Sequence, residues 1–237
     1  DAHDALHPLR YAAGALLAAL GPGAQLLRER GFVADHDACV LAGEEGRHLS
    51  GDALEALARG GRLAKVAGAY ACAWHEPGGA VCLARDPIGE RTLYWAERGD
   101  CLVFASTVQG VLASGLVERR LDPEALLRYL TYAYVPGHRT MVLGVTELEP
   151  GELLCWRPGR ATRQTLWEVP AEAETARWDE ESLCAALRAT LERAVRRPLP
   201  AGQPVCATLS GGVDSSLVVA LARRLHDAPV HTLSVSF

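Results

Sequence analysis

The sequence predicts two folds in succession: an α+β domain of antiparallel sheets with helices, then the first βαβ unit of an α/β domain with a parallel sheet. Two observations carry this prediction. Between residues 66 and 106, four short apolar segments alternate with turn sequences, which is typical of an antiparallel meander with one covered face. In residues 204–235, an apolar strand pattern, a Gly-rich turn, a helical pattern and a second apolar strand follow one another, which predicts a parallel, right-handed βαβ unit.

The composition is that of an ordinary soluble globular protein, with 49% hydrophobic and 22% charged residues. The net charge of −5 gives no basic surface for nucleic acid. No apolar run approaches the ~18 residues of a membrane helix, and residues 1–20 lack the basic start and apolar core of a signal peptide. We therefore expect a cytoplasmic protein that binds neither nucleic acid nor membrane.

The cysteines are odd in number, scattered, and never form a CxxC pair, which argues against a disulfide framework and a structural zinc site and fits a reducing cytosol. They are Cys39, Cys72, Cys82, Cys101, Cys155, Cys184 and Cys206. His3 and His7 have the spacing of two helical metal ligands, but no third ligand is fixed nearby, so we expect no metal there.

The first elements are short. A helix is expected over residues 11–20, ended by Gly and Pro at 21–23, and a buried strand over residues 38–42. After a turn at residues 43–46, a helix over residues 52–58 has Ser50 or Asp52 as its cap.

The meander strands are separated by Gly- and Pro-containing turns. They span residues 69–74, 80–85, 92–95 and 101–106. A helix follows over residues 122–134, with Asp122 as its cap and Pro123 at its first position. Three further elements are expected before the βαβ unit. They are a strand over residues 153–156, a polar linker over residues 168–180 and an amphipathic helix over residues 181–196.

The Gly-rich turn reads Ser210-Gly211-Gly212-Val213-Asp214-Ser215-Ser216. Glycines allow a tight turn, and the free N–H groups at the start of the next helix attract an anion such as phosphate. A carboxylate such as Asp214 beside phosphates usually implies a bridging Mg²⁺. The competing interpretation is a Gly-Ser turn with an N-capped helix. No Gly-Lys-Ser/Thr follows, so this is not a Walker A loop.

The stretch resembles the PP-loop of the ATP pyrophosphatase superfamily. Its sequence is most similar to those of asparagine synthetases and their β-lactam synthetase and lasso peptide cyclase relatives. Further segments resemble that family in the same order along the chain. These are Arg85–Gly89 with Leu93–Tyr94, Phe104–Ser106, Leu121–Leu126, Tyr134–Pro136, Leu148–Gly151 and His231–Val235.

The resemblance implies two domains. Residues 1–170 would form a degenerate class II glutamine-amidotransferase-like domain with the N-terminal-nucleophile fold, and residues 171–237 the N-terminal part of an ATP-binding synthetase domain. The chain departs from the family in the first domain, because it begins with Asp1 rather than Cys and has no Arg-Gly-Pro-Asp stretch.

The family's Asn-Gly-Glu oxyanion and glutamine-binding motif appears here as Ala42-Gly43-Glu44, and Asp52 could match the carboxylate that holds the glutamine amino group. The change to Ala removes a hydrogen-bond donor worth roughly 3 kcal/mol to a tetrahedral intermediate. We expect an inactive glutaminase half and assign no catalytic residue.

In the synthetase half, the resemblance implies an ATP and Mg²⁺ site. The loop amides and the hydroxyls of Ser210, Ser215 and Ser216 would hold the β and γ phosphates, and Asp214 would bind Mg²⁺. Leu209 and Val235 would line or hydrogen-bond the adenine, with core packing as the equally weighted alternative. Arg85 and Asp86 are interpreted as structural residues of the meander turn, and Cys206 as a buried small apolar residue.

The implied function is an ATP-dependent, AMP-forming carbon–nitrogen ligase that activates a carboxylate as acyl-AMP, as in a glutamine-dependent asparagine synthetase. The second interpretation is an intramolecular lactam- or macrolactam-forming synthetase, and the third is a catalytically silent scaffold or binding domain. The partners would be a small-molecule or peptide carboxylate and either glutamine or an intramolecular amine, and a homodimer is compatible with each. Since the family's synthetase domain continues far beyond one βαβ unit, we expect either a partial sequence or a chain that cannot catalyse alone.

Overall fold

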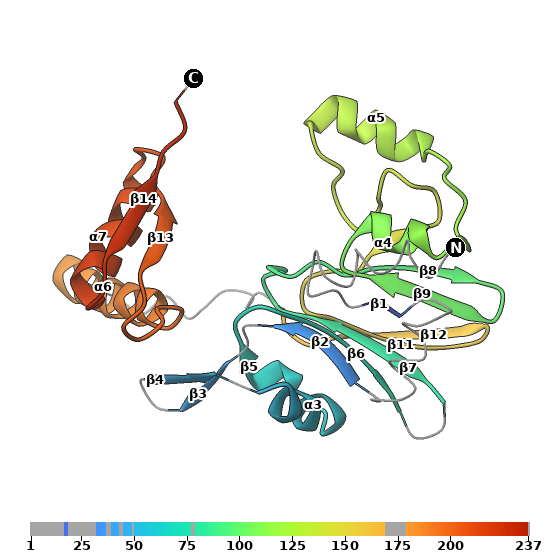
Figure 1. Cartoon of the computed structure of the whole chain (residues 1–237), viewed down its shortest axis with the longest axis horizontal. Helices are drawn as coiled ribbons and strands as arrows, with labels where there is room; N and C mark the ends of the chain where they lie inside the picture. Colours follow the sequence, from blue (N-terminus) through green and yellow to red (C-terminus); the bar gives the residue numbers. More distant parts are fainter. Residues whose placement is uncertain are drawn as a thin grey trace. The chain divides into compact units, whose positions relative to one another are not determined.

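The computed structural model describes residues 17–18, 32–36, 39–42, 45–48, 50–76, 79–168 and 179–236 (Figure 1). The chain divides into two compact units, Asp1–Val40 with Arg47–Val169 and Leu41–Gly46 with Pro170–Phe237. His3, His7 and most of the linker predicted over residues 168–180 lie outside the described residues. Within the described part of the chain, no helix is long and apolar enough to cross a membrane.

Two antiparallel sheets form the first unit (Figure 1). The five-stranded sheet has the order β12-β11-β7-β6-β2, and the four-stranded sheet the order β1-β9-β8-β10. The strands of the first are β2 (Phe32–His36), β6 (Tyr70–His75), β7 (Val81–Arg85), β11 (Glu152–Arg157) and β12 (Arg160–Thr165). Those of the second are β1 (Leu17–Ala18), β8 (Tyr94–Arg98), β9 (Cys101–Ala105) and β10 (Thr146–Glu147).

The inner faces of the two sheets share one core cluster. Ala71, Ala73 and Leu83 from the five-stranded sheet pack with Leu93 and Phe104 from the β8–β9 side. All five side chains are at most 2% exposed, so the sheets form a sandwich with a dry interior.

Helices cover the outer faces. Leu54 of α3 (Gly51–Arg59) packs with Tyr70 and Trp74 of β6, and Val111 of α4 (Val108–Ala113) packs with Val103 of β9. The expectation of one covered face is therefore wrong: β6 is buried on both faces. Its nearly continuous apolar sequence is the physical reason, since a strand with one wet face would alternate apolar and polar residues.

The remaining elements of the chain up to the linker lie outside the two large sheets. The 3₁₀ turn η1 (Leu63–Lys65) leads into β5 (Val66–Ala67), which joins β3 (Cys39–Ala42) and β4 (Glu45–His48) in a sheet of order β4-β3-β5. Helix α5 (Pro123–Tyr132) lies beyond α4, away from the sheets (Figure 1). Its predicted Asp122 cap and first-position proline are confirmed.

Four further sequence predictions need correction. The four strands predicted between residues 66 and 106 do not form one meander, because β6 and β7 belong to the five-stranded sheet and β8 and β9 to the four-stranded sheet. The helix expected over residues 11–20 is wrong where the structure describes it, because Leu17–Ala18 pair with β9 as a strand. The strand expected over residues 92–95 begins later, at Tyr94, because the turn before it extends to residue 91. Strand β12 was missed because all six of its residues are exposed and show no apolar alternation.

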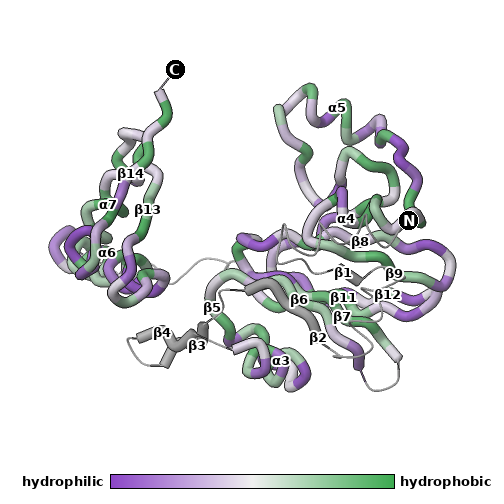
Figure 2. The backbone as a smooth tube through the Cα atoms, viewed as in Figure 1, coloured by the Kyte–Doolittle hydropathy of each residue, from purple (hydrophilic) through white to green (hydrophobic). Residues whose placement is uncertain are grey.

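The second unit contains α6 (Glu180–Arg196), β13 (Val205–Thr208), α7 (Val213–Leu225) and β14 (Val230–Leu233). Strands β13 and β14 pair in parallel with α7 between them in the sequence, which confirms the predicted strand–helix–strand order. Hydropathy alternates along α6, as expected for an amphipathic helix (Figure 2).

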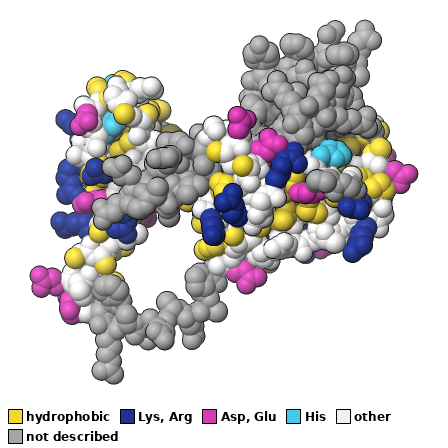
Figure 3. Space-filling view, turned by 90° about the horizontal axis from the view of Figure 1, so that it is seen from below, with side chains coloured by type: hydrophobic (Ala, Val, Ile, Leu, Met, Phe, Trp, Pro, Cys, Tyr) yellow, Lys and Arg dark blue, Asp and Glu magenta, His cyan; other side chains and the backbone are white. Residues whose placement is uncertain are grey.

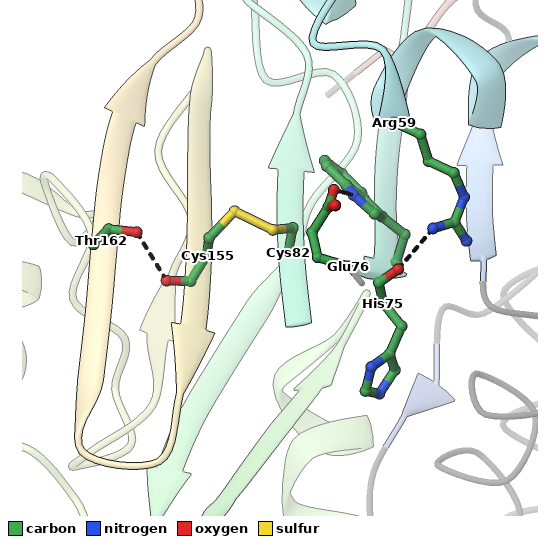
Figure 4. Close-up of a disulfide and its surroundings, with 7 residues drawn as sticks. Arg59, His75, Glu76, Cys82, Cys155 and Thr162 are labelled. Carbon is green, nitrogen blue, oxygen red and sulfur yellow. Dashed lines mark hydrogen bonds between the residues drawn. A yellow bond between two sulfur atoms is a disulfide. The ribbon is translucent and has the colours of Figure 1, made fainter. Parts of the chain in front are cut away.

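Cys82 and Cys155 form a disulfide between β7 and β11 (Figure 4). They are direct partners in the antiparallel register, with 4.1 Å between their Cα atoms, and lie 73 residues apart in the chain. The expectation that the chain has no disulfides is therefore wrong for this pair. The spacing of the two cysteines in the sequence does not reveal the disulfide, because only the strand register brings them together. Elsewhere in the described residues, Cys72, Cys101, Cys184 and Cys206 are free thiols.

Asp86 is the acceptor that shapes the turn after β7. It is 1% exposed. Its Oδ1 accepts from the backbone N–H groups of Ile88, Gly89 and Glu90 at 3.0, 2.6 and 3.1 Å. Its Oδ2 accepts from the N–H of Arg91 at 3.0 Å. One carboxylate thus satisfies most of the amides of this turn, as the structural interpretation of Asp86 predicts.

Arg85 connects the same turn to the other sheet. Its guanidinium donates to the carbonyls of Gly89, Arg91 and Leu148 at 2.9, 2.6 and 2.5 Å. It also pairs with Glu147 of β10 at 2.8 Å, and Arg85 is only 5% exposed. Arg85 and Asp86 are therefore structural residues in the interior of the sandwich.

We predict that Asp86→Ala lowers the free energy of unfolding of the first unit by about 3–5 kcal/mol, because several buried N–H groups lose their acceptor at once. Urea unfolding followed by tryptophan fluorescence measures this loss. Asp100→Ala, in the exposed β8–β9 turn, is the matched control and should change stability by no more than about 0.5 kcal/mol. Equal effects of the two substitutions would contradict the role of Asp86.

The cap of α5 makes stability depend on pH. Burial raises the pKa of Asp122, but hydrogen bonds from the amides of Ala125 and Glu124 and the guanidinium of Arg139 outweigh it, and the net pKa is lowered. The stabilisation is therefore present above the unfolded pKa of about 3.9 and is lost as the pH falls through the folded value.

We predict that the stability gap between wild type and Asp122→Asn, measured by urea unfolding, shrinks from pH 7 to pH 3, because Asn keeps a cap but not the charge. Asp122→Ala should cost about 1 kcal/mol more than Asp122→Asn at pH 7, because it removes the cap as well. A gap that does not change with pH would refute this origin of the stabilisation.

Candidate functional site

The Gly-rich stretch forms the connection between β13 and α7. The strand ends at Thr208 and the helix begins at Val213. Gly211 has φ +84°. A side chain at this position would meet no atom within 4 Å, so the backbone conformation, not space, favours glycine.

The N-terminus of α7 differs from those of the other described α-helices. Helices α3, α4, α5 and α6 are each capped by a side chain, those of Ser50, Thr107, Asp122 and Asp179. The N-cap of α7 is Gly212, which has no side chain to offer its first turn. The first-turn amides of α7 therefore remain open to an external acceptor, and the helix dipole favours an anion there.

Hydroxyl groups connect the two ends of the loop. Ser215 Oγ accepts from the Ser210 N–H at 3.2 Å, lies 2.9 Å from Ser210 Oγ and donates to the Gly212 carbonyl at 3.2 Å. Ser210 Oγ in turn accepts weakly from the Gly212 N–H at 3.4 Å. The Ser216 hydroxyl makes no hydrogen bond within the described residues, although its N–H donates to Gly212 as the helix begins.

Asp214 lies in the first turn of α7 and is exposed. No group of three or more His, Cys, Asp and Glu that could hold a metal occurs among the described residues. A site with one carboxylate suits Mg²⁺ bound largely through substrate phosphates and water, which is the usual arrangement for this ion. Asp214 therefore fits an Mg²⁺ that arrives with a nucleotide.

The two residues predicted to contact adenine differ in their surroundings. Both backbone groups of Leu209 are engaged, since its N–H donates to Leu233 at 2.8 Å and its carbonyl accepts from Ser234 Oγ at 2.7 Å. Val235 follows β14 and is 81% exposed, so the alternative of core packing does not hold for it in this structure. Cys206, expected to be buried, is exposed, because β13 belongs to a two-stranded sheet in the described structure.

An apolar groove of about 420 Å³ lies between α6 and α7. Its floor includes Leu187, Leu191, Leu217 and Leu221, and Arg188 and Arg224 flank it. One face of the second unit shows basic side chains beside exposed hydrophobic ones (Figure 3). The groove does not include the Gly-rich loop.

The residues matched to a glutamine site are only partly within the described structure. Ala42 ends β3, Gly43 and Glu44 lie outside the described residues, and Asp52 is exposed in the first turn of α3. The arrangement of the four residues thus stays a prediction. Cys72 is not suited to act as a nucleophile in the amidotransferase-like part of the chain. Its side chain is fully buried, and burial raises the pKa of its thiol.

Two family models match the chain, one in each part. Residues 53–167 match the glutamine amidotransferase domain, and residues 186–237 match asparagine synthase. The class of protein is therefore one that combines a glutamine amidotransferase-type domain with an asparagine synthase part.

The curated relatives define the family. The chain is 31% identical over 166 residues to asparagine synthetase [glutamine-hydrolyzing] 1 and 29% identical over 170 residues to asparagine synthetase [glutamine-hydrolyzing] 3, both from Bacillus subtilis (strain 168). These matches cover 69% of this chain and 26% and 27% of the relatives. The chain belongs to the asparagine synthetase family and spans about a quarter of the length of these relatives.

Other similarities are weaker or more remote. Amidase chry2 of Gibberella zeae is 31% identical over 156 residues, covering 64% of this chain and 22% of the amidase. Among solved structures, glutamine phosphoribosylpyrophosphate amidotransferase from B. subtilis matches with a TM-score of 0.35 and 14% identity, covering 85% of this chain and 45% of that one. A likeness at that score carries no argument about this chain.

Proposed function

We propose that the chain carries part of the ATP site of an AMP-forming ligase that activates a carboxylate and joins it to an amine. The observation that carries the proposal is the uncapped N-terminus of α7 directly after the Ser210–Gly212 turn, in a chain of the asparagine synthetase family. Open amides, a glycine at positive φ and three hydroxyls at one helix start suit the phosphates of a nucleotide.

All residues of the stretch from Ser210 to Ser216 except Val213 have a role in this proposal. The backbone of Gly211 and Gly212 and the hydroxyls of Ser210, Ser215 and Ser216 hold the β and γ phosphates. Asp214 binds Mg²⁺, which when bound offsets the charge on the departing pyrophosphate. Leu209 and Val235 line the adenine, Leu209 with its side chain because its backbone groups are already engaged.

The proposed reaction has two steps. An oxygen of the substrate carboxylate forms a bond to the α phosphorus of ATP while the bond to the bridging oxygen breaks, and pyrophosphate leaves. The nitrogen of an amine then attacks the acyl carbon, AMP leaves, and the amine loses a proton as the amide forms. The loop acts in the first step, by orienting the phosphates so that pyrophosphate can depart.

We assign residues 1–170 to the amidotransferase-like domain and residues 171–237 to the start of the synthetase domain, which the positions of the two family matches support. The glutaminase half is proposed to be inactive. Ala42 has no side-chain amide to donate to a tetrahedral oxyanion, a loss of about 3 kcal/mol in transition-state stabilisation.

Ala42 also favours a second candidate within the same class. An enzyme that cannot release ammonia from glutamine must obtain its amine elsewhere, and an amine carried by the substrate itself meets that need. The product would then be a lactam or macrolactam formed within one molecule, with the same loop activating the carboxylate.

We predict that Asp214→Ala in the full native polypeptide lowers carboxylate-dependent ATP–pyrophosphate exchange at least ~100-fold, because the leaving pyrophosphate loses its metal. Asp227→Ala, which removes an exposed carboxylate after the other end of α7, is the matched control and should leave exchange unchanged. Wild-type exchange rates in Asp214→Ala would refute the assignment.

We also predict that the full native polypeptide releases glutamate from glutamine at least ~100-fold more slowly than an active glutaminase, with or without ATP, because the oxyanion donor is replaced at Ala42. A coupled glutamate assay measures this, with an active glutaminase added to the same reaction as the positive control. Glutamate release within about tenfold of the positive control would show that the amidotransferase half works.

A further inference from the structure

The peptide group that joins Leu209 to Ser210 is held at both ends by serine hydroxyls. Its carbonyl oxygen, that of Leu209, accepts from Ser234 Oγ at 2.7 Å. Its N–H, that of Ser210, donates to Ser215 Oγ at 3.2 Å. This single peptide group connects Leu209, the residue directly after β13, to the Gly-rich loop, so its orientation sets the direction in which the loop leaves the strand.

The two serines come from different elements. Ser215 lies in the first turn of α7, and Ser234 is the residue directly after β14. The N–H of Leu209 also donates to Leu233 at 2.8 Å, which continues the parallel ladder one step beyond β13. Leu209 is therefore attached through both of its backbone groups to the end of β14 and the residue that follows it.

A Gly-rich loop needs such attachment. Gly211 has φ +84°, and Gly211 and Gly212 together allow many backbone conformations, so the loop loses much conformational freedom when it becomes ordered. The Leu209–Ser210 peptide group lies directly before these glycines, so it can rotate with the loop unless hydrogen bonds hold it. Bonds that hold it in the free protein reduce the ordering cost that a bound nucleotide must otherwise meet.

We propose that Ser234 is a positioning residue of the ATP site, which acts by holding the Leu209–Ser210 peptide group in the orientation that presents the loop to phosphate. This inference rests on the proposed ATP-binding function. Ser234 does not itself need to touch the nucleotide, because its hydroxyl is already bonded to the Leu209 carbonyl.

The test compares three variants of the full native polypeptide. Ser234→Ala removes the hydroxyl, Ser234→Thr keeps it, and Ser236→Ala removes a neighbouring exposed hydroxyl that makes no hydrogen bond within the described residues. Two quantities are measured: hydrogen–deuterium exchange of the amides of residues 209–217 without nucleotide, and the Kd for Mg·ATP by calorimetry.

For Ser234→Ala we expect faster exchange confined to residues 209–217 and an affinity for Mg·ATP about three- to tenfold weaker, the effect of one hydrogen bond. Ser234→Thr should stay within about twofold of the wild-type Kd, and Ser236→Ala should match the wild type in both measurements.

The outcomes separate this inference from the proposed function. A wild-type protein that does not bind Mg·ATP overturns the proposed function. A wild type that binds, with Ser234→Ala indistinguishable from Ser236→Ala, leaves that function standing and overturns the role of Ser234. Faster exchange throughout α6, α7 and β14 in Ser234→Ala also overturns it, because the hydroxyl would then stabilise the unit as a whole rather than position the loop.

Discussion

The sandwich depends on the buried hydrogen bonds of Arg85 and Asp86. Asp86 collects the amides of the turn after β7, and Arg85 reaches from β7 to the Leu148 carbonyl and to Glu147 of the other sheet. Neither charge would be tolerated in this interior without partners, because burying an unpaired ion costs several kcal/mol. The fold therefore requires a buried donor and a buried acceptor at these two positions. Arg85 donates to carbonyl and carboxylate oxygens, and Asp86 accepts from backbone N–H groups. Two adjacent charged residues in a turn between strands can resemble a catalytic site in the sequence. In this structure, Arg85 and Asp86 hold the turn and connect the two sheets.

Local signals in the sequence predict local structure well. Asp122 before Pro123 identifies the start of α5 because the cap is a contact between residues two and three positions apart. Strands β6, β7, β8 and β9 are likewise visible as apolar segments between turns, although their division between two sheets is not. Strand β12 is not, because it is an edge strand whose six side chains are all exposed. Its place is set by pairing with β11, which no periodicity in its own residues reports.

The candidate site shows the same division between local and distant information. The stretch from Ser210 to Ser216 predicts its own turn and helix start, since glycine conformations and first-turn amides follow from neighbouring residues. The bond from Ser234 to the Leu209 carbonyl depends on the register of β13 with β14, so it becomes visible only when the strands are placed. The exposure of Cys206 and Val235 also depends on what covers the sheet, and sequence patterns around those residues do not contain that information.

Asp214 illustrates why the uncapped helix and the family match have to be considered together. A carboxylate in the first turn of a helix is favourable by itself, by about 0.3–1 kcal/mol, because it complements the helix dipole. That contribution needs no ligand and would explain Asp214 in an ordinary helix. In this loop, however, the same carboxylate stands where the open amides of α7 attract an anion, and two negative groups at one helix end repel each other. Under the proposed function, a divalent cation held by Asp214 would remove this conflict, and the dipole would then favour the complex rather than the carboxylate alone. An N-cap of glycine in place of a capping side chain is consistent with that proposal, because it leaves the first-turn amides of α7 without a side-chain acceptor.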